Sequence, residues 1–224
     1  MTATTGQVAI IGATGALGQR IARLLRGEYP LVLLAREQGR IPEDLTHHPF
    51  SPVDLRKPEQ LTAALEHVAH GEGLHGVVNA AGVVAFGPFG DVPPLVSEEL
   101  MAVNATSVLR MLDTAARHLP PGGFVVNLTG VAGEMALTGM GPYCASKYAA
   151  AAAMKIAGKE LGRRGIRVLD VRLGHCETGL AERALHGTPP RLPRGIDPDH
   201  AAARIVQALH GAETLLRAED FTSA

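Results

Sequence analysis

A turn built on evenly spaced glycines joins the first apolar run of this chain to its first helical stretch. Residues 7–11 read as a strand, Gly12, Gly15 and Gly18 follow it, and a helix is expected over residues 18–26. Glycines in this place allow a tight turn and close packing of a helix on the preceding strand. A strand that leads through such a turn into a helix predicts the first unit of a parallel sheet with crossover helices.

The rest of the chain repeats this alternation of apolar runs and helical stretches. Further strands are expected at residues 31–35, 50–54, 76–79, 124–128 and 166–173, and helices at 58–69, 97–118, 142–163 and 198–210. Strands that are apolar throughout are typical of a parallel sheet covered on both faces. The sequence therefore predicts a single domain over residues 1–224, a three-layer α/β/α structure with a doubly wound parallel β-sheet, the Rossmann fold. Residues 215–221 form either a last edge strand or a frayed tail.

Charge and composition argue against several other classes of protein. The net charge is −1 over 224 residues with no long run of one sign, so nucleic-acid and membrane-surface binding have little electrostatic support. The apolar runs are too short to span a bilayer and residues 1–7 lack a signal-peptide pattern, so we expect a cytoplasmic protein. Ten histidines occur without a zinc-binding spacing, and no metal site is expected. Cys144 and Cys176 read as small buried residues and not as nucleophiles.

The glycine turn also predicts a ligand. The N-terminus of the following helix offers free N–H groups and the positive end of the helix dipole, which together favour an anion such as a pyrophosphate. Strand, glycine turn and helix in this order indicate a dinucleotide-binding site, although a plain glycine-rich turn is the alternative. The residues expected to bind the dinucleotide here are Gly12, Thr14, Gly15, Ala16, Leu17 and Gly18.

Arg36 favours NADP over NAD as that dinucleotide. Folds of this kind usually place an acidic residue roughly 20 positions beyond the glycines, where it binds the adenosine ribose. Arg36 stands there instead, at the end of the second expected strand, and a guanidinium pairs well with a 2′-phosphate. A solvent-exposed arginine at a strand end is the alternative. Asp54, followed by Leu55, either faces the adenine ring or caps the next helix.

A tyrosine and a lysine one helical turn apart form a candidate acid–base pair. Tyr143 and Lys147 are i and i+4 on the helix expected over residues 142–163, so they share one face. An ammonium group near a phenol favours the phenolate and lowers the phenol pKa from about 10 towards neutrality. Such a tyrosine exchanges a proton with an alcohol/carbonyl pair.

With these motifs in order, the chain resembles the short-chain dehydrogenase/reductase family, in its single-domain branch, over nearly its whole length. Asn104, in Val103-Asn104-Ala105, matches the family asparagine that holds a water in the proton relay. The family's Asn-Asn-Ala-Gly element beside the nicotinamide-side ribose is similar to a run of four residues at the end of the fourth expected strand, Asn79, Ala80, Ala81 and Gly82.

The resemblance assigns roles to the remaining candidate residues. It implies that Tyr143 is the general acid–base and also contacts the cofactor, and that Lys147 binds the nicotinamide ribose. Gly174 and Thr178 belong to the element that follows the sixth strand, with Thr178 at the nicotinamide amide. The implied substrate is a small carbonyl compound or alcohol. A capping asparagine or a satisfied surface tyrosine is the alternative for a single residue of the set.

Three departures from the family pattern stand beside these matches. The glycine spacing resembles that of the extended members, and Leu173 replaces a usual proline. Gly130 stands where the family has the serine that hydrogen-bonds the substrate carbonyl, and losing one such donor costs roughly 3–4 kcal/mol. Thr129 points to the opposite face of its strand and does not replace that serine without a twist of the strand end. The donor could instead be a water, a polar group of the substrate, or the side chain of Thr138, His175 or Tyr143.

Two further regions carry expectations from the resemblance. Residues 174–197 are expected to close over the substrate, with residues 139–141 on the opposite wall. The alanine run at residues 149–153 allows close approach of another helix, and the family pairs its two long helices in a dimer seam. We therefore expect a homodimer or homotetramer, with tight packing inside one subunit as the alternative.

Two hypotheses of function follow. The first is an NAD(P)-dependent oxidoreductase that transfers hydride between nicotinamide and a carbonyl or secondary alcohol, with Tyr143 as general acid–base and Lys147 and Asn104 in support. The second is an NADP-binding regulatory or scaffold protein whose catalysis is weak or lost because Gly130 replaces the serine. Isomerase, epimerase or dehydratase chemistry remains open on the same scaffold.

Overall fold

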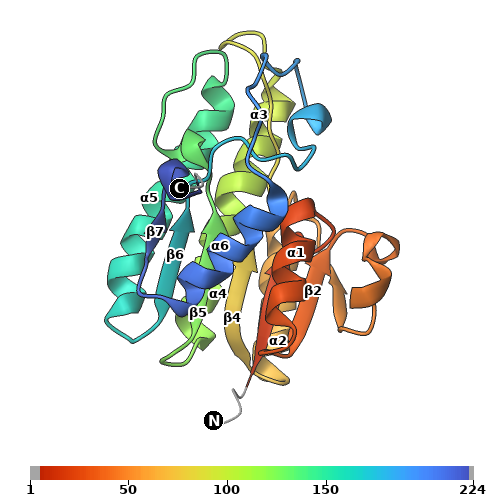
Figure 1. Ribbon diagram of the computed structural model, residues 1–224, viewed down its shortest axis with the longest axis vertical. Helices are drawn as coiled ribbons and strands as arrows, with labels where there is room; N and C mark the ends of the chain where they lie inside the picture. Colours follow the sequence, from red (N-terminus) through yellow and green to blue (C-terminus); the bar gives the residue numbers. More distant parts are fainter. Residues whose placement is uncertain (1–5, 222–224) are drawn as a thin grey trace.

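The computed structural model describes residues 6–221; residues 1–5, which belong to the segment without a signal-peptide pattern, and residues 222–224 lie outside the described part. Seven parallel strands form one sheet in the order β3-β2-β1-β4-β5-β6-β7 (Figure 1). The strands are β1 Gln7–Ile11, β2 Leu31–Ala35, β3 Phe50–Pro52, β4 Leu74–Asn79, β5 Phe124–Leu128, β6 Arg167–Val171 and β7 Leu215–Leu216. The expected doubly wound sheet is confirmed.

Helices cover both faces of the sheet, and the sheet separates two apolar cores. The core on one face includes side chains of α1 (Ala16–Leu25) and α6 (Pro198–His210), and these two helices lie side by side in Figure 1. The other core includes side chains of α2 (Pro58–His70), α4 (Ser107–His118) and α5 (Gly141–Gly162). Successive residues of β1 alternate between the cores, since Val8 and Ile10 pack in the first and Ala9 and Ile11 in the second.

The helix expected over residues 97–118 differs in its start and its interior. It begins at Pro94 as α3 (Pro94–Met101), because proline is tolerated in the first turn of a helix. A π-helical turn (Ala102–Thr106) then leads into α4, and it contains Asn104. Such turns occur frequently at functional sites. Apolar spacing does not reveal them, because the chain remains helical throughout.

Smaller differences concern the ends of strands. β3 ends at Pro52 and not at Asp54, whose N–H bonds the side chain of Gln60 at 3.0 Å. β6 is shorter than the expected residues 166–173. Residues 215–221 combine the two-residue strand β7 with a short 3-10 turn, Ala218–Phe221. Between residues 6 and 221, no helix is long and apolar enough to cross a membrane.

Candidate active site

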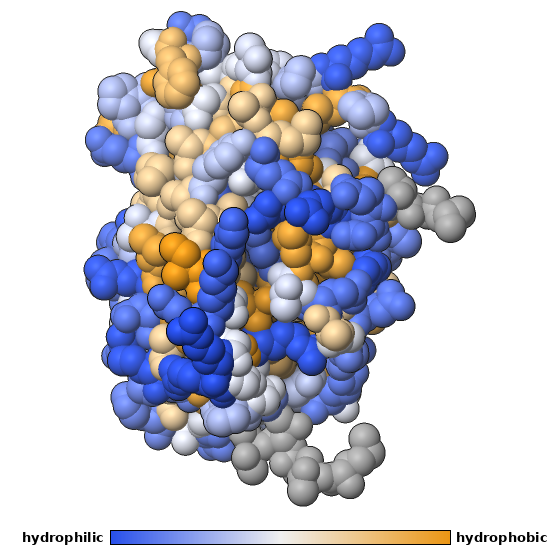
Figure 2. All heavy atoms as spheres, turned by 90° about the vertical axis from the view of Figure 1, so that its left-hand side faces the viewer, coloured by the Kyte–Doolittle hydropathy of each residue, from blue (hydrophilic) through white to orange (hydrophobic). Residues whose placement is uncertain are grey.

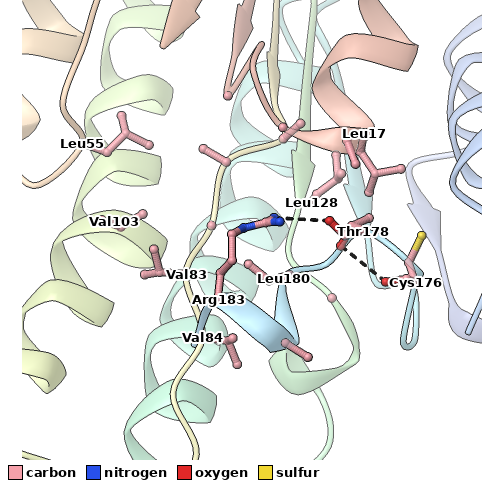
Figure 3. A pocket seen from close by; sticks show the side chains of 18 of the residues that line it. Leu17, Leu55, Val83, Val84, Val103, Leu128, Cys176, Thr178, Leu180 and Arg183 are labelled. Atoms are coloured by element: carbon pink, nitrogen blue, oxygen red, sulfur yellow. Dashed lines mark hydrogen bonds between the residues drawn. The ribbon is translucent and has the colours of Figure 1, made fainter. Parts of the chain in front are cut away.

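The carboxyl ends of the strands open into a cleft of about 720 Å³. The glycine turn after β1, the segments after β2 and β3, and residues 80–84 after β4 form one part of its wall. Residues 128–132 at the end of β5 and several residues of the segment 173–185 after β6 form another part (Figure 3), and residues between 137 and 147 also line the cleft. This is the edge at which doubly wound sheets bind ligands.

The glycine turn brings the main chains after β1 and β4 into close contact. Gly12 has a φ of +80°, and a Cβ atom there would lie 2.8 Å from the Ala81 amide nitrogen. The Gly15 N–H donates to the Gly12 carbonyl at 2.8 Å, and α1 then begins with neither a capping side chain nor an acidic residue in its first turn. The N-terminus of α1 therefore suits an anion. Gly18 lies behind the wall, against the Gly12 carbonyl, while the turn residues that line the cleft are Gly12, Thr14, Gly15, Ala16 and Leu17.

Arginine side chains gather at the β2–β3 end of the cleft. Arg36 follows β2 directly and is exposed on the cleft wall, as is Arg40. Asp54 lies after β3 and pairs with Arg56, whose hydrogen bond lowers the pKa of the carboxyl group. The residue that caps α2 is Lys57 and it makes no side-chain cap, so the expected alternative of Asp54 as helix cap is wrong. Leu55 also lines the cleft.

Helix α5 places both members of the tyrosine–lysine pair on the cleft wall. The Lys147 Nζ lies 5.9 Å from the centre of the Tyr143 ring and donates to the main-chain oxygen of Leu128 at 3.2 Å. Burial lowers the pKa of Lys147 to about 8, against the opposing effect of Asp170. Burial raises the pKa of Tyr143, so the expected lowering is wrong for the protein alone. Removing the phenol from water disfavours its charged form, and this effect of burial is the largest cause of the shift.

Asn104 lies behind the wall and ties two of its segments together. Its Oδ1 accepts from the Val83 N–H at 3.0 Å, and its Nδ2 donates to the Val83 carbonyl at 2.9 Å. The same Nδ2 donates to the Ser146 hydroxyl at 3.1 Å, and that hydroxyl donates to the Tyr143 carbonyl at 2.7 Å. Asn104 therefore holds the segment after β4 against the helix that carries the tyrosine.

A buried chain of polar side chains crosses the sheet from β4 to β6. Asn79 donates to Asn127 at 2.8 Å, and Asn127 donates to the Thr129 hydroxyl at 2.9 Å. Thr129 in turn donates to Asp170, which also accepts from Arg172 at 2.8 Å. Burial raises the pKa of Asp170 in spite of these two donors. The Thr129 hydroxyl is thus engaged within the sheet and does not serve as the missing donor.

Gly130 lies on the cleft wall with a backbone that differs from an ordinary strand end. Its φ is +80° and its ψ is 164°, and its N–H donates to the Val171 carbonyl at 2.9 Å. Among the side chains considered for the missing hydrogen bond, Tyr143 and His175 line the cleft. Thr138 is exposed and is not among the residues of the cleft wall.

The segment after β6 forms the remaining side of the cleft. Gly174 and Thr178 line it, and the Thr178 hydroxyl donates to the Cys176 carbonyl at 3.3 Å. Arg183 reaches back along the cleft and donates to the Thr178 carbonyl at 3.2 Å (Figure 3). Cys176 is half-buried, and burial raises the pKa of its thiol to about 11, which opposes a nucleophilic role. Opposite this segment, the expected residues Ala80, Ala81 and Gly82 line the cleft, together with Val83, Val84 and Phe86.

A sequence model of the short chain dehydrogenase family matches residues 7–188. The chain belongs to this family. This short-chain dehydrogenase is 28% identical to nodulation protein G of Rhizobium meliloti, over 81% of this chain and 78% of that one. It is 28% identical to D-threitol dehydrogenase of Mycolicibacterium smegmatis, over 95% of this chain and 84% of that one. A solved short-chain dehydrogenase from Sphingobium yanoikuyae, in complex with NADPH, has a TM-score of 0.82 at 25% identity and covers 95% of this chain and 87% of its own.

Of the residues 139–141 expected on the wall, Met140 lines the cleft and Gly139 and Gly141 are not among its lining residues. Sequence reasoning missed most of the other apolar side chains of this wall. Val84 and Phe86 are buried beside the cleft, and other apolar side chains join them from residues 137–140 and from the segment after β6. These residues lie in loops, where no periodicity marks a face. The sequence assigns no role to Arg183 within residues 174–197, because the direction of its guanidinium group depends on how that segment folds.

Proposed function

We propose that this short-chain dehydrogenase reduces a carbonyl compound, or oxidises the corresponding secondary alcohol, with NADP as its cofactor. One observation carries the proposal: Tyr143 and Lys147 lie on the wall of the same cleft as the glycine turn. The relatives named as dehydrogenases and reductases, and the NADPH complex of a similar fold, support the same reaction class.

The residues along the cleft fit NADP. The first turn of α1 has no carboxylate to compete with a pyrophosphate. Arg36 and Arg40 are exposed at the end of the cleft after β2, where guanidinium groups suit a 2′-phosphate. We assign Asp54 and Leu55 to the adenine side. On the nicotinamide side we assign Asn79, Ala80, Ala81, Gly82, Gly174 and Thr178. Asn79 acts indirectly, because its side-chain oxygen accepts from the main-chain N–H of Ala81 and so positions that segment.

The chemistry divides between cofactor and protein. When bound, the nicotinamide supplies a hydride to the carbonyl carbon. The carbonyl oxygen takes the hydroxyl proton of Tyr143, so C=O becomes CH–OH and a phenolate is left. Burial favours the protonated phenol, which is the form needed for reduction. The ammonium group of Lys147 stabilises the phenolate as it forms, and Asn104 positions the helix that carries both.

The test replaces Tyr143 by phenylalanine. Tyr143→Phe is expected to abolish ketone-dependent NADPH oxidation, while calorimetry gives the same NADP affinity as the unchanged protein. Tyr148→Phe is the matched control, because Tyr148 lies on the same helix and is exposed. Unchanged turnover in Tyr143→Phe would contradict the proposal.

Gly130 is the observation that favours a second function, an NADP-binding regulatory or scaffold protein. A missing carbonyl donor slows reduction by a factor of about 10² to 10³. NADP binding without turnover of any ketone or alcohol would support this second function. NADPH oxidation that depends on both a ketone and Tyr143 would exclude it.

We further propose a homodimer or homotetramer that joins through α4 and α5. Large apolar side chains on these helices are exposed, with Leu109 at 55% and Ile156 at 56%. Figure 2 views the left-hand side of Figure 1, where α5 lies, and shows patches of apolar residues between hydrophilic ones on that face. We also propose a cytoplasmic location, since the free cysteines Cys144 and Cys176 suit a reducing compartment.

A further inference from the structure

The two ends of the cleft differ in the charge of the residues that line them. Three of its charged wall residues, Arg36, Arg40 and Asp54, follow β2 and β3, while Lys147 and Arg183 lie nearer the other end. Tyr143 lies at the other end, beside the segment after β5, and β1 and β4 stand between β2 and β5 in the sheet. Since neighbouring strands are about 4.8 Å apart, the ends of β2 and β5 are roughly 14 Å apart. The charges that suit the cofactor therefore do not surround the reacting end.

Tyr143 packs within a cluster of apolar side chains drawn from three segments. Val84 and Phe86 follow β4, Met140 directly precedes α5, and Leu180 belongs to the segment after β6. Val84 and Phe86 are 4% and 6% exposed, so they are packed into the wall and do not project from its rim. Further apolar side chains line the same cleft, namely Leu137, Leu185 and Leu192.

The main-chain polar groups of this wall are already paired with one another. The Leu185 N–H donates to the Val84 carbonyl at 2.8 Å, and the Phe86 N–H donates to the His186 carbonyl at 2.9 Å. The Met140 N–H donates to the Leu137 carbonyl at 3.1 Å. These main-chain groups therefore offer few free hydrogen-bond partners to a substrate.

The polar side chains nearby are also engaged or directed elsewhere. Thr178 donates to the Cys176 carbonyl, and the His175 Nε2 lies 3.5 Å from a carboxylate oxygen of Glu177. Arg183 points towards Thr178 and away from Val84, as Figure 3 shows. Lys147 donates to the Leu128 carbonyl. Apart from Tyr143 and these engaged polar groups, the side chains of the wall at this end are apolar.

We propose that the substrate is an uncharged ketone or secondary alcohol whose flanking groups are aliphatic or aromatic, and that sugars and polyols are poor substrates. This inference rests on the proposed reductase function. Each hydroxyl of a polyol leaves water at this wall without gaining a partner, which opposes binding. Each methylene group of an apolar substrate gains from the same burial.

The test compares ketones that differ only in chain length or hydroxyl content. With NADPH, kcat/KM is expected to rise about three- to fourfold per methylene group from 2-butanone to 2-octanone, until the cleft is filled. Erythrulose has the carbon chain of 2-butanone with three added hydroxyl groups, and its kcat/KM is expected to be at least about tenfold lower than that of 2-butanone. Erythrulose turned over faster than 2-octanone would overturn the inference and leave the proposed function standing.

A variant of the wall links this preference to the structure. Leu180→Ala is expected to lower kcat/KM for 2-octanone about five- to tenfold and for 2-butanone by a smaller factor, because the longer ketone buries more apolar surface against the wall. Leu24→Ala is the control, because Leu24 is an exposed leucine of α1 that does not line the cleft. An equal loss for both ketones would contradict the assigned wall.

Calorimetry gives a readout that does not depend on turnover. 2-Octanol is expected to bind the NADP-loaded protein with a negative change in heat capacity, which marks burial of apolar surface. Threitol is expected to show no binding. If no compound is turned over, the proposed function fails, and this measurement still decides the inference: threitol binding more tightly than 2-octanol would overturn it.

Discussion

The main-chain oxygen of Leu173 is the nearest neighbour to the space beside Gly130, and it would lie 3.8 Å from a Cβ atom placed on that glycine. There is therefore room for a side chain. The backbone conformation nevertheless disfavours a side chain, because a φ of +80° with a ψ of 164° is a conformation that almost only glycine adopts. Restoring the family's serine at this position thus requires a strained or rearranged main chain.

Gly130→Ala is expected to lower the free energy of unfolding by about 1–3 kcal/mol, measured by urea denaturation. Gly130→Ser shares the same strain and is expected to lose the same stability. The comparison of the two variants isolates the hydroxyl group, and we expect the serine variant to reduce ketones at least about tenfold faster than the alanine variant. Equal rates would show that a hydroxyl group at this position does not reach the substrate carbonyl.

The lowered pKa of Lys147 predicts how stability depends on pH. Burial moves this pKa from 10.5 to about 8 in the folded chain. Between these values the unfolded state binds the proton and the folded state does not, so stability rises with pH across this window. Below pH 8 the buried ammonium group costs about 3 kcal/mol, and the cost disappears by pH 10.5.

Lys147→Met tests this dependence without the titrating group. The variant is expected to be more stable than the unchanged protein at pH 7, and the difference is expected to shrink as the pH rises from 8 to 10.5. Chemical denaturation of both proteins at a series of pH values measures it. A constant difference across this window would show that Lys147 keeps an ordinary pKa. The raised pKa of Tyr143 affects the stability of both proteins in the same way, so it cancels in the difference between their free energies of unfolding.

The sequence predicted those parts of the structure that local patterns determine. Apolar β-branched runs placed β1, β2 and β5 at their observed bounds, and the glycine turn placed the cleft. The expected lowering of the Tyr143 pKa was wrong, because side chains from the segments after β4 and β6 and from the turn before α5 bury the phenol. Asp170 is visible as a charge inside an apolar strand, yet its bond to Thr129 depends on the register that pairs Asn127 with Asp170. Register is a property of the folded sheet.

The buried polar chain across the sheet is expected to contribute to stability. Thr129→Val leaves the Asp170 carboxylate without one donor and the Asn127 amide without an acceptor, so the free energy of unfolding should fall by about 1–3 kcal/mol. Thr114→Val is the matched control. Thr114 is equally buried, but its hydroxyl donates only to the helix carbonyl of Arg110, at 3.0 Å. A smaller loss for Thr129→Val than for Thr114→Val would contradict a stabilising role of the chain.

Arg36 is expected to decide the choice between NADPH and NADH. Between residues 6 and 221 its exposed guanidinium has no hydrogen-bond partner, so it is available to a 2′-phosphate. Arg36→Ala should raise the KM for NADPH about tenfold and change the KM for NADH less than twofold, measured by initial rates. Arg23→Ala is the control, since Arg23 pairs with Asp44 and does not line the cleft. An equal rise in the KM for NADPH and the KM for NADH would show that Arg36 contacts a portion of the dinucleotide that both cofactors contain.

Ile156 tests the proposed seam between subunits. It is 56% exposed on α5, so Ile156→Glu should change the stability of a single subunit by no more than about 0.5 kcal/mol. In a seam of paired helices the same carboxylate would be desolvated without a partner, which opposes association. Light scattering after size exclusion is therefore expected to give a smaller assembly for this variant. Leu24→Glu, on α1 and 44% exposed, should leave the mass unchanged. If both variants keep the mass of the unchanged protein, the subunits do not meet through α5, because an apolar seam does not tolerate a buried carboxylate at its centre.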